Sequence, residues 1–284
     1  MPKVFHRYGV DYDEVFAPVV KYVSIRCVLA LANKFDMEIH QMDVKSAYLN
    51  SDIDTNIYMK QPTGYIDNKN PELVCKLNKS IYGLKQSARC WNKLIDEYLK
   101  SEGYVQNKAD PCIYVKSIIQ ENKKILTIIT LYVDDTIICC NDIDYLREEK
   151  LKISSRFEME DQGEIHYLLG MSIKRDRANK ILTIDQKLYL EGVLKRFGMA
   201  NCNPVSTPME NGKRFQALTN DDEGVDINEY QAVIGSLVYA SIATRPDISA
   251  VVGVLSKFMV KPGTDHWSGV KRILRYLKGT LSYG

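Results

Sequence analysis

The sequence predicts an α+β fold, in which an antiparallel sheet packs against helices. The first observation is composition: 284 residues, 45% hydrophobic and 26% charged, are typical of a globular chain long enough to bury a sizeable core. The second is that segments with apolar residues at helical spacing alternate with short period-2 or continuous apolar runs. The third is that two pairs of these runs are joined by short polar stretches, which favours hairpins and antiparallel pairing.

In the first third of the chain the pattern predicts a helix, a strand and a second helix. Apolar spacing predicts a helix over residues 24–35, and alternation over residues 37–44 predicts a strand that ends near Asp43. A Gly-containing loop then leads to an amphipathic helix, which we expect to use Ser87 as its N-cap and to stop at Gly103. An acidic side chain is thus placed at the end of a strand.

The middle of the chain predicts paired strands. Residues 112–119 and 124–133 are predicted to be strands joined by a tight hairpin, and Asp134–Asp135 to form a second turn before the next apolar run. Helical spacing returns over residues 143–157, and residues 166–186 predict a strand, a charged turn and a return strand. Helices and antiparallel strands alternate here as in a split β-α-β arrangement.

The last third of the chain has a polar stretch between predicted helices and a basic C-terminal end. Residues 187–199 predict a helix, and residues 209–228, acidic at 221–223, form a polar stretch that is the best candidate for a linker. Three helices are expected after it, one of them starting at Pro246, since proline favours the first turn of a helix. From residue 255 onward six Lys and Arg stand against one Asp, so this end has a net charge of +5 and forms a basic patch.

Composition excludes several classes of protein. Seven cysteines, without a C-x-x-C pair and without a secretory leader, indicate reduced thiols in an intracellular protein rather than a disulfide scaffold or a Cys-based metal site. No apolar run approaches the ~20 residues that span a bilayer, so no membrane partner is expected. The overall charge of +2 is too small to indicate nucleic acid by itself.

The pair Asp134–Asp135 allows two interpretations. Aspartate is common in turns, so a hairpin turn alone accounts for it. A third carboxylate, Asp43, is however expected at the same edge of the sheet. Two unit charges about 4 Å apart repel by roughly 4 kcal/mol at an effective dielectric near 20, so such a cluster requires a proton or a cation. Mg²⁺ prefers carboxylate oxygens and completes its shell with water and phosphates, which indicates phosphoryl transfer.

Five segments of the chain form an ordered series of motifs. They are DYDEVFAPVVKYVSIR, QMDVKSAYLNSDIDTNIYMKQPTGY, VCKLNKSIYGLKQSARCWN, LYVDDTIIC and YLLGMSIKR. In this order they resemble the reverse transcriptase domain of copia-type LTR retrotransposon Pol polyproteins, from about Tyr8 to Gly284. The resemblance implies a right-hand polymerase palm with partial fingers, the start of a thumb and a helical C-terminal connection segment.

The resemblance also implies roles at the acidic site. Asp43, Asp134 and Asp135 match catalytic aspartates that hold two Mg²⁺ ions, with Mn²⁺ as an alternative. Val44 matches a residue whose carbonyl is a further metal ligand beside the nucleotide. Tyr48 falls where an aromatic ring lies against the sugar of the incoming nucleotide and excludes a 2′-hydroxyl. Core packing is the other interpretation of Tyr48, and the two are compatible.

Further residues are expected to contact nucleotide, primer or template. Gln86 matches a glutamine whose amide contacts the incoming nucleotide. Lys85 and Arg89 beside it either meet phosphate or template, or lie on a solvated helix face. The hairpin over residues 166–186 resembles the segment that grips the primer terminus. The residues expected to bind primer or template are Lys85, Arg89, Tyr132, Gly170, Met171, Lys174 and Arg175. Trp91 is expected in the core rather than as a base-stacking platform.

The same resemblance implies a division into segments. We expect partial fingers and the palm with the primer-grip hairpin over residues 1–186, and a thumb-like helix and turn over 187–208. The polar linker is expected over 209–228, and a helical connection segment over 229–284, leading toward an RNase H that is absent.

Two functions of different classes are open at this point. The first is an RNA-directed DNA polymerase that binds an RNA or DNA template with primer, dNTPs and other segments of a Pol polyprotein. The second is a catalytically inactive, transposon-derived remnant that at most binds nucleic acid, as the reduced fingers would suggest. A two-carboxylate nuclease is disfavoured because Tyr48 and Gln86 would then have no use. With no targeting signal, the expected location is intracellular, in a cytoplasmic virus-like particle of the element.

Overall fold

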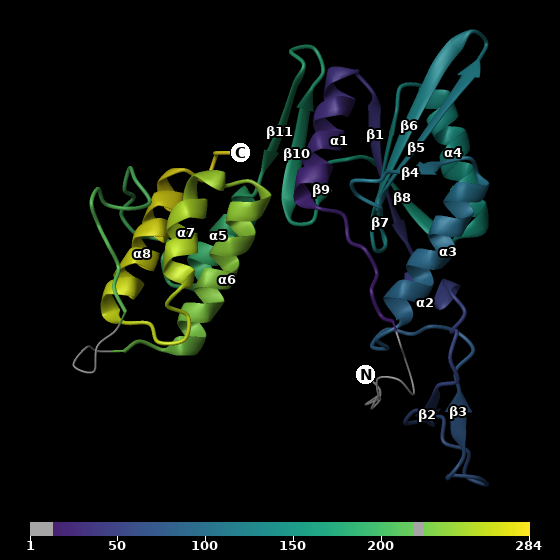
Figure 1. The fold of residues 1–284 in the computed structure, drawn as a ribbon, viewed down its shortest axis with the longest axis horizontal. Coiled ribbons are helices and arrows are strands. Elements are labelled where there is room, and N and C mark those ends of the chain that lie inside the picture. The colour runs from purple at the N-terminus through teal and green to yellow at the C-terminus, as the bar shows by residue number, and fades with distance from the viewer. Residues whose placement is uncertain (1–13, 218–223) are drawn as a thin grey trace. The chain divides into compact units, whose positions relative to one another are not determined.

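The chain folds into two compact units, each with its own core. The structure is a computed structural model that describes residues 14–217 and 224–284. The first unit is Met1–Ile165 and the second is His166–Gly284. The first contains an antiparallel sheet with helices and the second a small sheet followed by helices (Figure 1). The predicted α+β class is therefore confirmed.

A six-stranded antiparallel sheet forms the centre of the first unit. Its strands, in sheet order, are β4 (Val105–Gln106), β5 (Ile113–Gln120), β6 (Lys123–Tyr132), β7 (Asp135–Cys140), β1 (Glu38–Val44) and β8 (Met159–Glu164). The expected hairpins are both present, since β5 pairs with β6 and β6 pairs with β7. Strand β1 enters between β7 and β8, so a segment from early in the chain lies beside the second hairpin.

Helices cover both faces of this sheet. They are α1 (Tyr22–Lys34), the short α2 (Ala47–Asn50), α3 (Ser87–Ser101) and α4 (Ile143–Arg156). Figure 1 shows α3 and α4 on one side of the sheet and α1 on the other. The residues of β7 from Thr136 to Cys140 are accordingly all buried, although they alternate between the two faces. The continuous apolar run in the sequence reflects this double cover.

The second hairpin turn differs by one residue from the expected one. In the register, Tyr132 pairs with Asp135, so the two-residue loop is Val133–Asp134 and Asp135 is the first residue of β7. Val133 has a φ of 60°, a left-handed value at the first loop position that hairpin turns favour but that glycine usually occupies. The prediction that both aspartates form the turn is therefore wrong for Asp135, because strand pairing extends through it.

The start of α3 also differs from the expectation. Gln86 is the N-cap residue and Ser87 is the first residue of the helix. The hydroxyl of Ser87 donates to the carbonyl of Ile81 at 2.7 Å, so this side chain fixes the preceding loop rather than the helix N-terminus. The helix ends as predicted, with Gly103 at a φ of 87° just after it. Before α3, strands β2 (Tyr58–Lys60) and β3 (Val74–Lys76) form a separate two-stranded sheet.

The second unit begins with a three-stranded sheet and continues into a helical bundle. The sheet has the order β11 (Ile181–Asp185), β10 (Met171–Asp176) and β9 (Tyr167–Leu168). The helices are α5 (Lys187–Arg196), α6 (Ile227–Ala243), the 3₁₀ turn η1 (Pro246–Ile248), α7 (Ser249–Ser256) and α8 (Thr264–Gly279). Apolar residues from α5 to α8, among them Leu190, Leu237, Leu255 and Ile273, form its core. Pro246 lies at the start of a helical turn, as its position in the sequence predicts.

The boundary between the units does not coincide with the expected one after residue 186. It lies between Ile165 and His166, so the hairpin of β10 and β11 groups with the helices. Within the second unit, the hydroxyl of Tyr239 on α6 donates to the carbonyl of Leu169, next to this hairpin. Part of the expected linker, residues 218–223, lies outside the described residues.

Two expectations from composition can be compared with the structure. All seven cysteines are free thiols, as the absence of a disulfide pattern predicts. Within the two described ranges, no helix is both long and apolar enough to cross a bilayer.

Candidate active site

The three predicted aspartates lie together at one edge of the six-stranded sheet. Asp43 is directly opposite Asp135 in the antiparallel register of β1 and β7. Asp134 occupies the adjoining loop, and its carbonyl accepts a hydrogen bond of 3.1 Å from the backbone N–H of Val44. Residues 90 or more positions apart in the sequence are thus joined by strand pairing and by one further backbone hydrogen bond. The sequence predicted this convergence, and the structure has it.

Mutual repulsion and burial characterise the carboxylates. Burial, and then the charges of Asp134, Asp135 and Glu160, raise the pKa of Asp43. Burial also raises the pKa of Asp135, while a hydrogen bond from Gln41 opposes this shift and Asp134 adds to it. The Gln41 amide donates to Oδ1 of Asp135 at 3.0 Å. Negative charge is therefore concentrated here, and Gln41 holds one of the carboxylates in place.

A hydrogen bond from the buried side chain of Trp91 fixes the loop that bears Asp134. The indole Nε1 donates to the carbonyl of Val133 at 2.7 Å, and only 2% of the Trp91 side chain is exposed. The ring also contacts Phe157 edge-on, with 5.3 Å between centroids. Trp91 is therefore a core residue, as predicted. Beside it, an apolar cavity of about 390 Å³ is lined by Val133, Tyr48 and the segment from Val15 to Val19.

Tyr48 lies on α2, close to the acidic edge, in contact with a second tyrosine. Its ring centroid is 4.6 Å from that of Tyr82, with the two planes inclined at 46°. Burial, Tyr82 and Asp134 raise the pKa of Tyr48. Burial, then Asp134 and Asp43, raise the pKa of Tyr82. Both phenols therefore lie within electrostatic range of the aspartates.

The three carboxylates are chemically suited to divalent cations, but they do not form a preformed metal site. Across the described ranges, no three His, Cys, Asp or Glu side chains converge on one point as a metal site. Asp134 nevertheless raises the pKa of both Asp43 and Asp135, which shows that the three carboxylates are neighbours, and Mg²⁺ favours carboxylate oxygens. The metal site is accordingly a proposal and is treated as one below.

The residues around the start of α3 differ in their exposure to solvent. The Gln86 side chain is buried, with 1% exposed, and its amide donates to the hydroxyl of Thr55 at 3.1 Å. Lys85 is exposed. Arg89 forms an ion pair with Asp54 and donates through Nε to the carbonyl of Glu14 at 3.0 Å. In this arrangement Gln86 stabilises the loop, and its contact with a nucleotide stays a prediction.

The predicted primer-contacting residues fall into both units. Tyr132 is half-buried at the end of β6 in the first unit. Gly170, Met171, Lys174 and Arg175 belong to the second unit. There Met171 is fully buried and Gly170 lies against the hydroxyl of Tyr239, so neither presents a side chain to solvent. The Lys174 ammonium contacts Asp185 at 3.2 Å, although 70% of its side chain is exposed.

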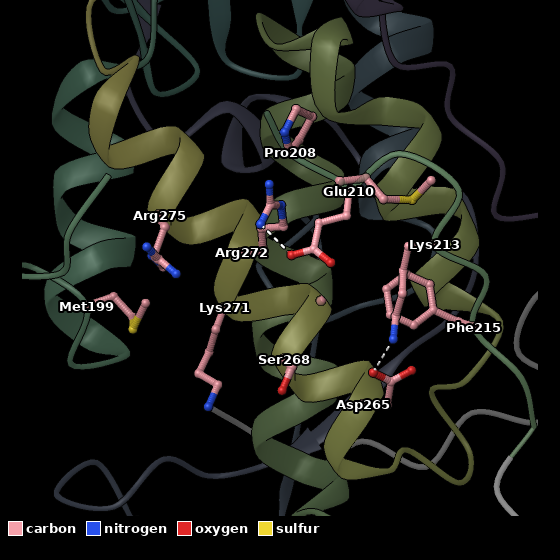
Figure 2. A pocket seen from close by; sticks show the side chains of 12 residues that line it. Met199, Pro208, Glu210, Lys213, Phe215, Asp265, Ser268, Lys271, Arg272 and Arg275 are labelled. Carbon is pink, nitrogen blue, oxygen red and sulfur yellow. Dashed lines mark hydrogen bonds and ion pairs between the residues drawn. The ribbon is translucent and has the colours of Figure 1, made fainter. Parts of the chain in front are cut away.

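The second unit contains a cavity of about 420 Å³ between α8 and the segment that precedes residue 216 (Figure 2). Two of its cations are in ion pairs, Arg272 with Glu210 at 2.7 Å and Lys213 with Asp265 at 2.6 Å. Lys271 and Arg275 have no acidic partner among the described residues, and Figure 2 shows both on the same flank of α8. The basic patch expected near the C-terminus therefore includes residues that line a cavity.

Three residues near the aspartates were missed by the sequence reasoning. Gln41 faces Asp135 because it lies two residues before Asp43 on the same face of β1. Glu160 pairs with Asp43 in the register of β1 and β8, which sequence spacing alone does not reveal. Tyr82 lies in the segment SIYGLKQ that precedes α3, where an aromatic ring beside a glycine was a signal that could have been used.

Comparison with known proteins gives a consistent result over nearly the whole chain. Residues 4–211 match the family model described as reverse transcriptase (RNA-dependent DNA polymerase). The chain is 44% identical over 277 residues to the retrovirus-related Pol polyprotein from transposon TNT 1-94 of Nicotiana tabacum, covering 96% of this chain and 21% of that one. It is 40% identical over 278 residues to that from transposon RE1 of Arabidopsis thaliana, covering 98% and 18%.

A shorter relative is covered over most of its length. The chain is 32% identical over 241 residues to a transposon Ty5-1 protein of Saccharomyces cerevisiae, covering 85% of this chain and 76% of that one. It spans only about a fifth of the TNT 1-94 and RE1 polyproteins, at 21% and 18% of their lengths. On the family model and these relatives, the chain belongs to the reverse transcriptase family, as found in the Pol polyproteins of copia-type transposons.

Proposed function

We propose that the chain is the polymerising part of a reverse transcriptase, which adds dNTPs to a primer 3′ end on an RNA or DNA template with two Mg²⁺ ions. The observation that carries the proposal is the register of β1 and β7, which sets Asp43 opposite Asp135 with Asp134 in the adjoining loop. A cluster of this kind costs stability in the folded chain, and a bound cation compensates that cost. Family membership supports the same assignment.

Each group of the site has a role in this proposal. Asp43, Asp134, Asp135 and the carbonyl of Val44 would hold the two cations. When bound, these ions would supply activation of the primer 3′-hydroxyl and neutralisation of the leaving pyrophosphate. Gln41 orients the Asp135 carboxylate through its 3.0 Å hydrogen bond. Tyr48 places an aromatic ring beside the acidic edge, where the sugar of the nucleotide would lie.

The proposal also assigns the units to parts of a polymerase hand. The six-stranded sheet with α1, α3 and α4 would correspond to a palm, and the β2–β3 sheet to a part of the fingers. Helix α5 would begin a thumb, followed by the helical connection segment from α6 to α8. Other segments of a Pol polyprotein are expected partners, because the polyproteins that match are about five times longer than the chain.

Primer extension tests this function directly. The full chain would be incubated with poly(rA)/oligo(dT), dTTP and Mg²⁺, beside Asp134→Asn and the matched control Asp144→Asn. Asp144 lies on α4, where it pairs with Arg147 and its side chain is 80% exposed. We expect extension by the unaltered chain and by Asp144→Asn, and a loss of about 10²-fold or more in Asp134→Asn. Equal extension by all three chains, or none by the unaltered chain, would contradict the proposal.

A second candidate function is nucleic-acid binding without polymerisation, and the cavity beside α8 favours it. Lys271 and Arg275 are one helical turn apart, and Nε of Arg275 donates to the carbonyl of Asn203 at 2.7 Å, which fixes its guanidinium. Such a pair of cations suits phosphates of a nucleic-acid backbone. If neither the unaltered chain nor Asp134→Asn extends the primer while both bind the primed template with the same salt dependence, the second function is favoured over the first.

A further inference from the structure

The loop before α3 carries a tyrosine that neither the motifs nor the comparisons assign. Tyr82 is 47% exposed, and its ring faces that of Tyr48 with 4.6 Å between centroids. Tyr82 therefore contacts α2 through the ring of Tyr48.

Helix α2 depends on this loop for its position. It has only four residues, Ala47–Asn50, and Ser46 before it has a left-handed φ of 52°. A single helical turn is not stable by itself, since nucleation costs more than one turn of hydrogen bonds returns. The direction of the Tyr48 ring is thus set by whatever packs against α2.

The loop is attached to α2 and its C-terminal end at further points. The N–H of Ser80 donates to the carbonyl of Ser51 at 3.0 Å. Lys79 forms an ion pair with Asp52 at 2.8 Å, and its ammonium also approaches the carbonyl of Asn50 at 3.4 Å. These contacts fix the loop backbone, so Tyr82 forms a firm support on one side of the Tyr48 ring.

We propose that Tyr82 is a positioning residue for the nucleotide sugar pocket: its ring keeps Tyr48 against the sugar and thereby sets the selection of deoxyribose over ribose. This inference rests on the proposed polymerase function and adds a determinant of substrate choice to it. Ring against ring is a stiff contact, because aromatic side chains have few rotatable bonds and prefer inclined or offset packing. Without the Tyr82 ring, Tyr48 has room to move away from the sugar, and a 2′-hydroxyl can be accommodated.

The test compares two substrates that differ only in the 2′-oxygen. The ratio of kcat/KM for dUTP to that for UTP would be measured on poly(rA)/oligo(dT) with the full chain. A pocket that rejects an added hydroxyl sterically discriminates by on the order of 10²-fold, and we expect Tyr82→Leu to lower the ratio about tenfold. Tyr82→Met is the second ring-free variant, in case one of the two folds poorly. Tyr82→Phe keeps the ring and should keep the ratio within about twofold.

Two controls separate positioning from a general structural role. Tyr65→Leu removes a tyrosine that is 84% exposed in the same unit and should leave the ratio unchanged. In a Tyr48→Ala background, Tyr82→Leu should have no further effect on the ratio, because the ring it positions is gone. An unchanged ratio in the ring-free variants, or an equal effect without Tyr48, overturns the inference while the polymerase function stands. Absence of extension by the unaltered chain overturns both.

Discussion

The indole of Trp91 donates a hydrogen bond of 2.7 Å to the carbonyl of Val133, the residue that precedes the first aspartate of the acidic pair. A core side chain on α3 is thereby bonded to the loop that carries Asp134. The loop has little freedom to relax, because Val133 is left-handed with a φ of 60°. The packing of the interior and the placement of a charged group at the surface are thus connected through one bond.

Replacement of Trp91 by Phe should weaken both the packing of the interior and the placement of Asp134. The change retains an aromatic ring but leaves the Val133 carbonyl without its donor, so we expect a loss of about 1–3 kcal/mol in the free energy of unfolding. We also expect primer extension to fall, since Asp134 would lose its fixed position. Urea denaturation and extension rates measure the two effects. Trp267→Phe, at the other tryptophan, is the control and should lower stability without a specific loss of extension.

Asp43→Asn should stabilise the metal-free chain at neutral pH. Burial and the neighbouring carboxylates raise the pKa of Asp43 above 3.8, so its contribution to stability is present below that value and is lost as the pH rises through the raised pKa. The amide cannot ionise, and the melting temperature in EDTA at about pH 7 should rise by roughly 1–3 °C. The difference from the unaltered chain should disappear toward about pH 3.5.

Asp142→Asn provides a control of opposite sign for this pH dependence. Hydrogen bonds from Lys123 and from the backbone N–H of Tyr145 lower the pKa of Asp142, so its contribution is present above 3.8 and is lost on acidification. Asparagine still caps α4, but without charge. Its melting temperature should therefore lie below that of the unaltered chain at neutral pH and approach it in acid. The same sign for both variants would contradict the assignment of charge repulsion to Asp43.

Gly170→Ala should destabilise the second unit. Gly170 has a φ of 78°, and a Cβ added there would lie 2.6 Å from the hydroxyl oxygen of Tyr239. The left-handed backbone alone costs an alanine roughly 1–2 kcal/mol, and displacement of Tyr239 adds to this. Gly192→Ala on α5 is the matched control, since a Cβ at this position would have nothing within 4 Å and helix propensity should stabilise the variant by about 0.5–1 kcal/mol. Thermal unfolding would show opposite shifts.

Charge reversal at the cavity beside α8 should weaken binding of single-stranded oligonucleotides. Lys271→Glu with Arg275→Glu removes the two cations that lack an acidic partner among the described residues. The slope of log affinity against log salt concentration should become shallower by about 1.4, as two phosphate contacts predict. Fluorescence anisotropy measures this slope. Lys257→Glu with Lys261→Glu, both exposed in the same unit, reproduces the change in charge and should leave the slope largely intact.

The sequence predicted those parts of the site that depend on strand alternation. Period-2 patterns placed Asp43 and the Asp134–Asp135 pair at strand ends, and antiparallel pairing then made their proximity a reasonable expectation. The exact turn was not predictable in this way, because a β-branched residue at Val133 gives no sign that it adopts a positive φ. Sequence spacing likewise could not show that Tyr82 faces Tyr48, since the two belong to separate segments of the chain.

The second unit was less predictable for a different reason. Its helices follow clear apolar spacing, and all three expected after the linker are present. The sequence did not show that the hairpin from Met171 to Asp185 groups with the helices of the second unit. This grouping depends on which neighbouring residues bury Met171 and Ile173. Short strands carry too few residues to reveal their partner. The burial of Gln86 was missed similarly, since a polar side chain is expected outside unless its partner, here Thr55, is known.

Under the proposed function, the left-handed backbone at Val133 opposes the stability of the fold to the rate of DNA synthesis in any directed evolution of this chain. Glycine adopts such a conformation freely, whereas an L-residue gives up roughly 1–2 kcal/mol there. A screen that rewards heat resistance alone would thus enrich glycine at position 133. A screen that rewards DNA synthesis would keep a side chain, because a glycine would loosen the loop bearing Asp134. The residue recovered at this single position would reveal which of the two pressures had acted.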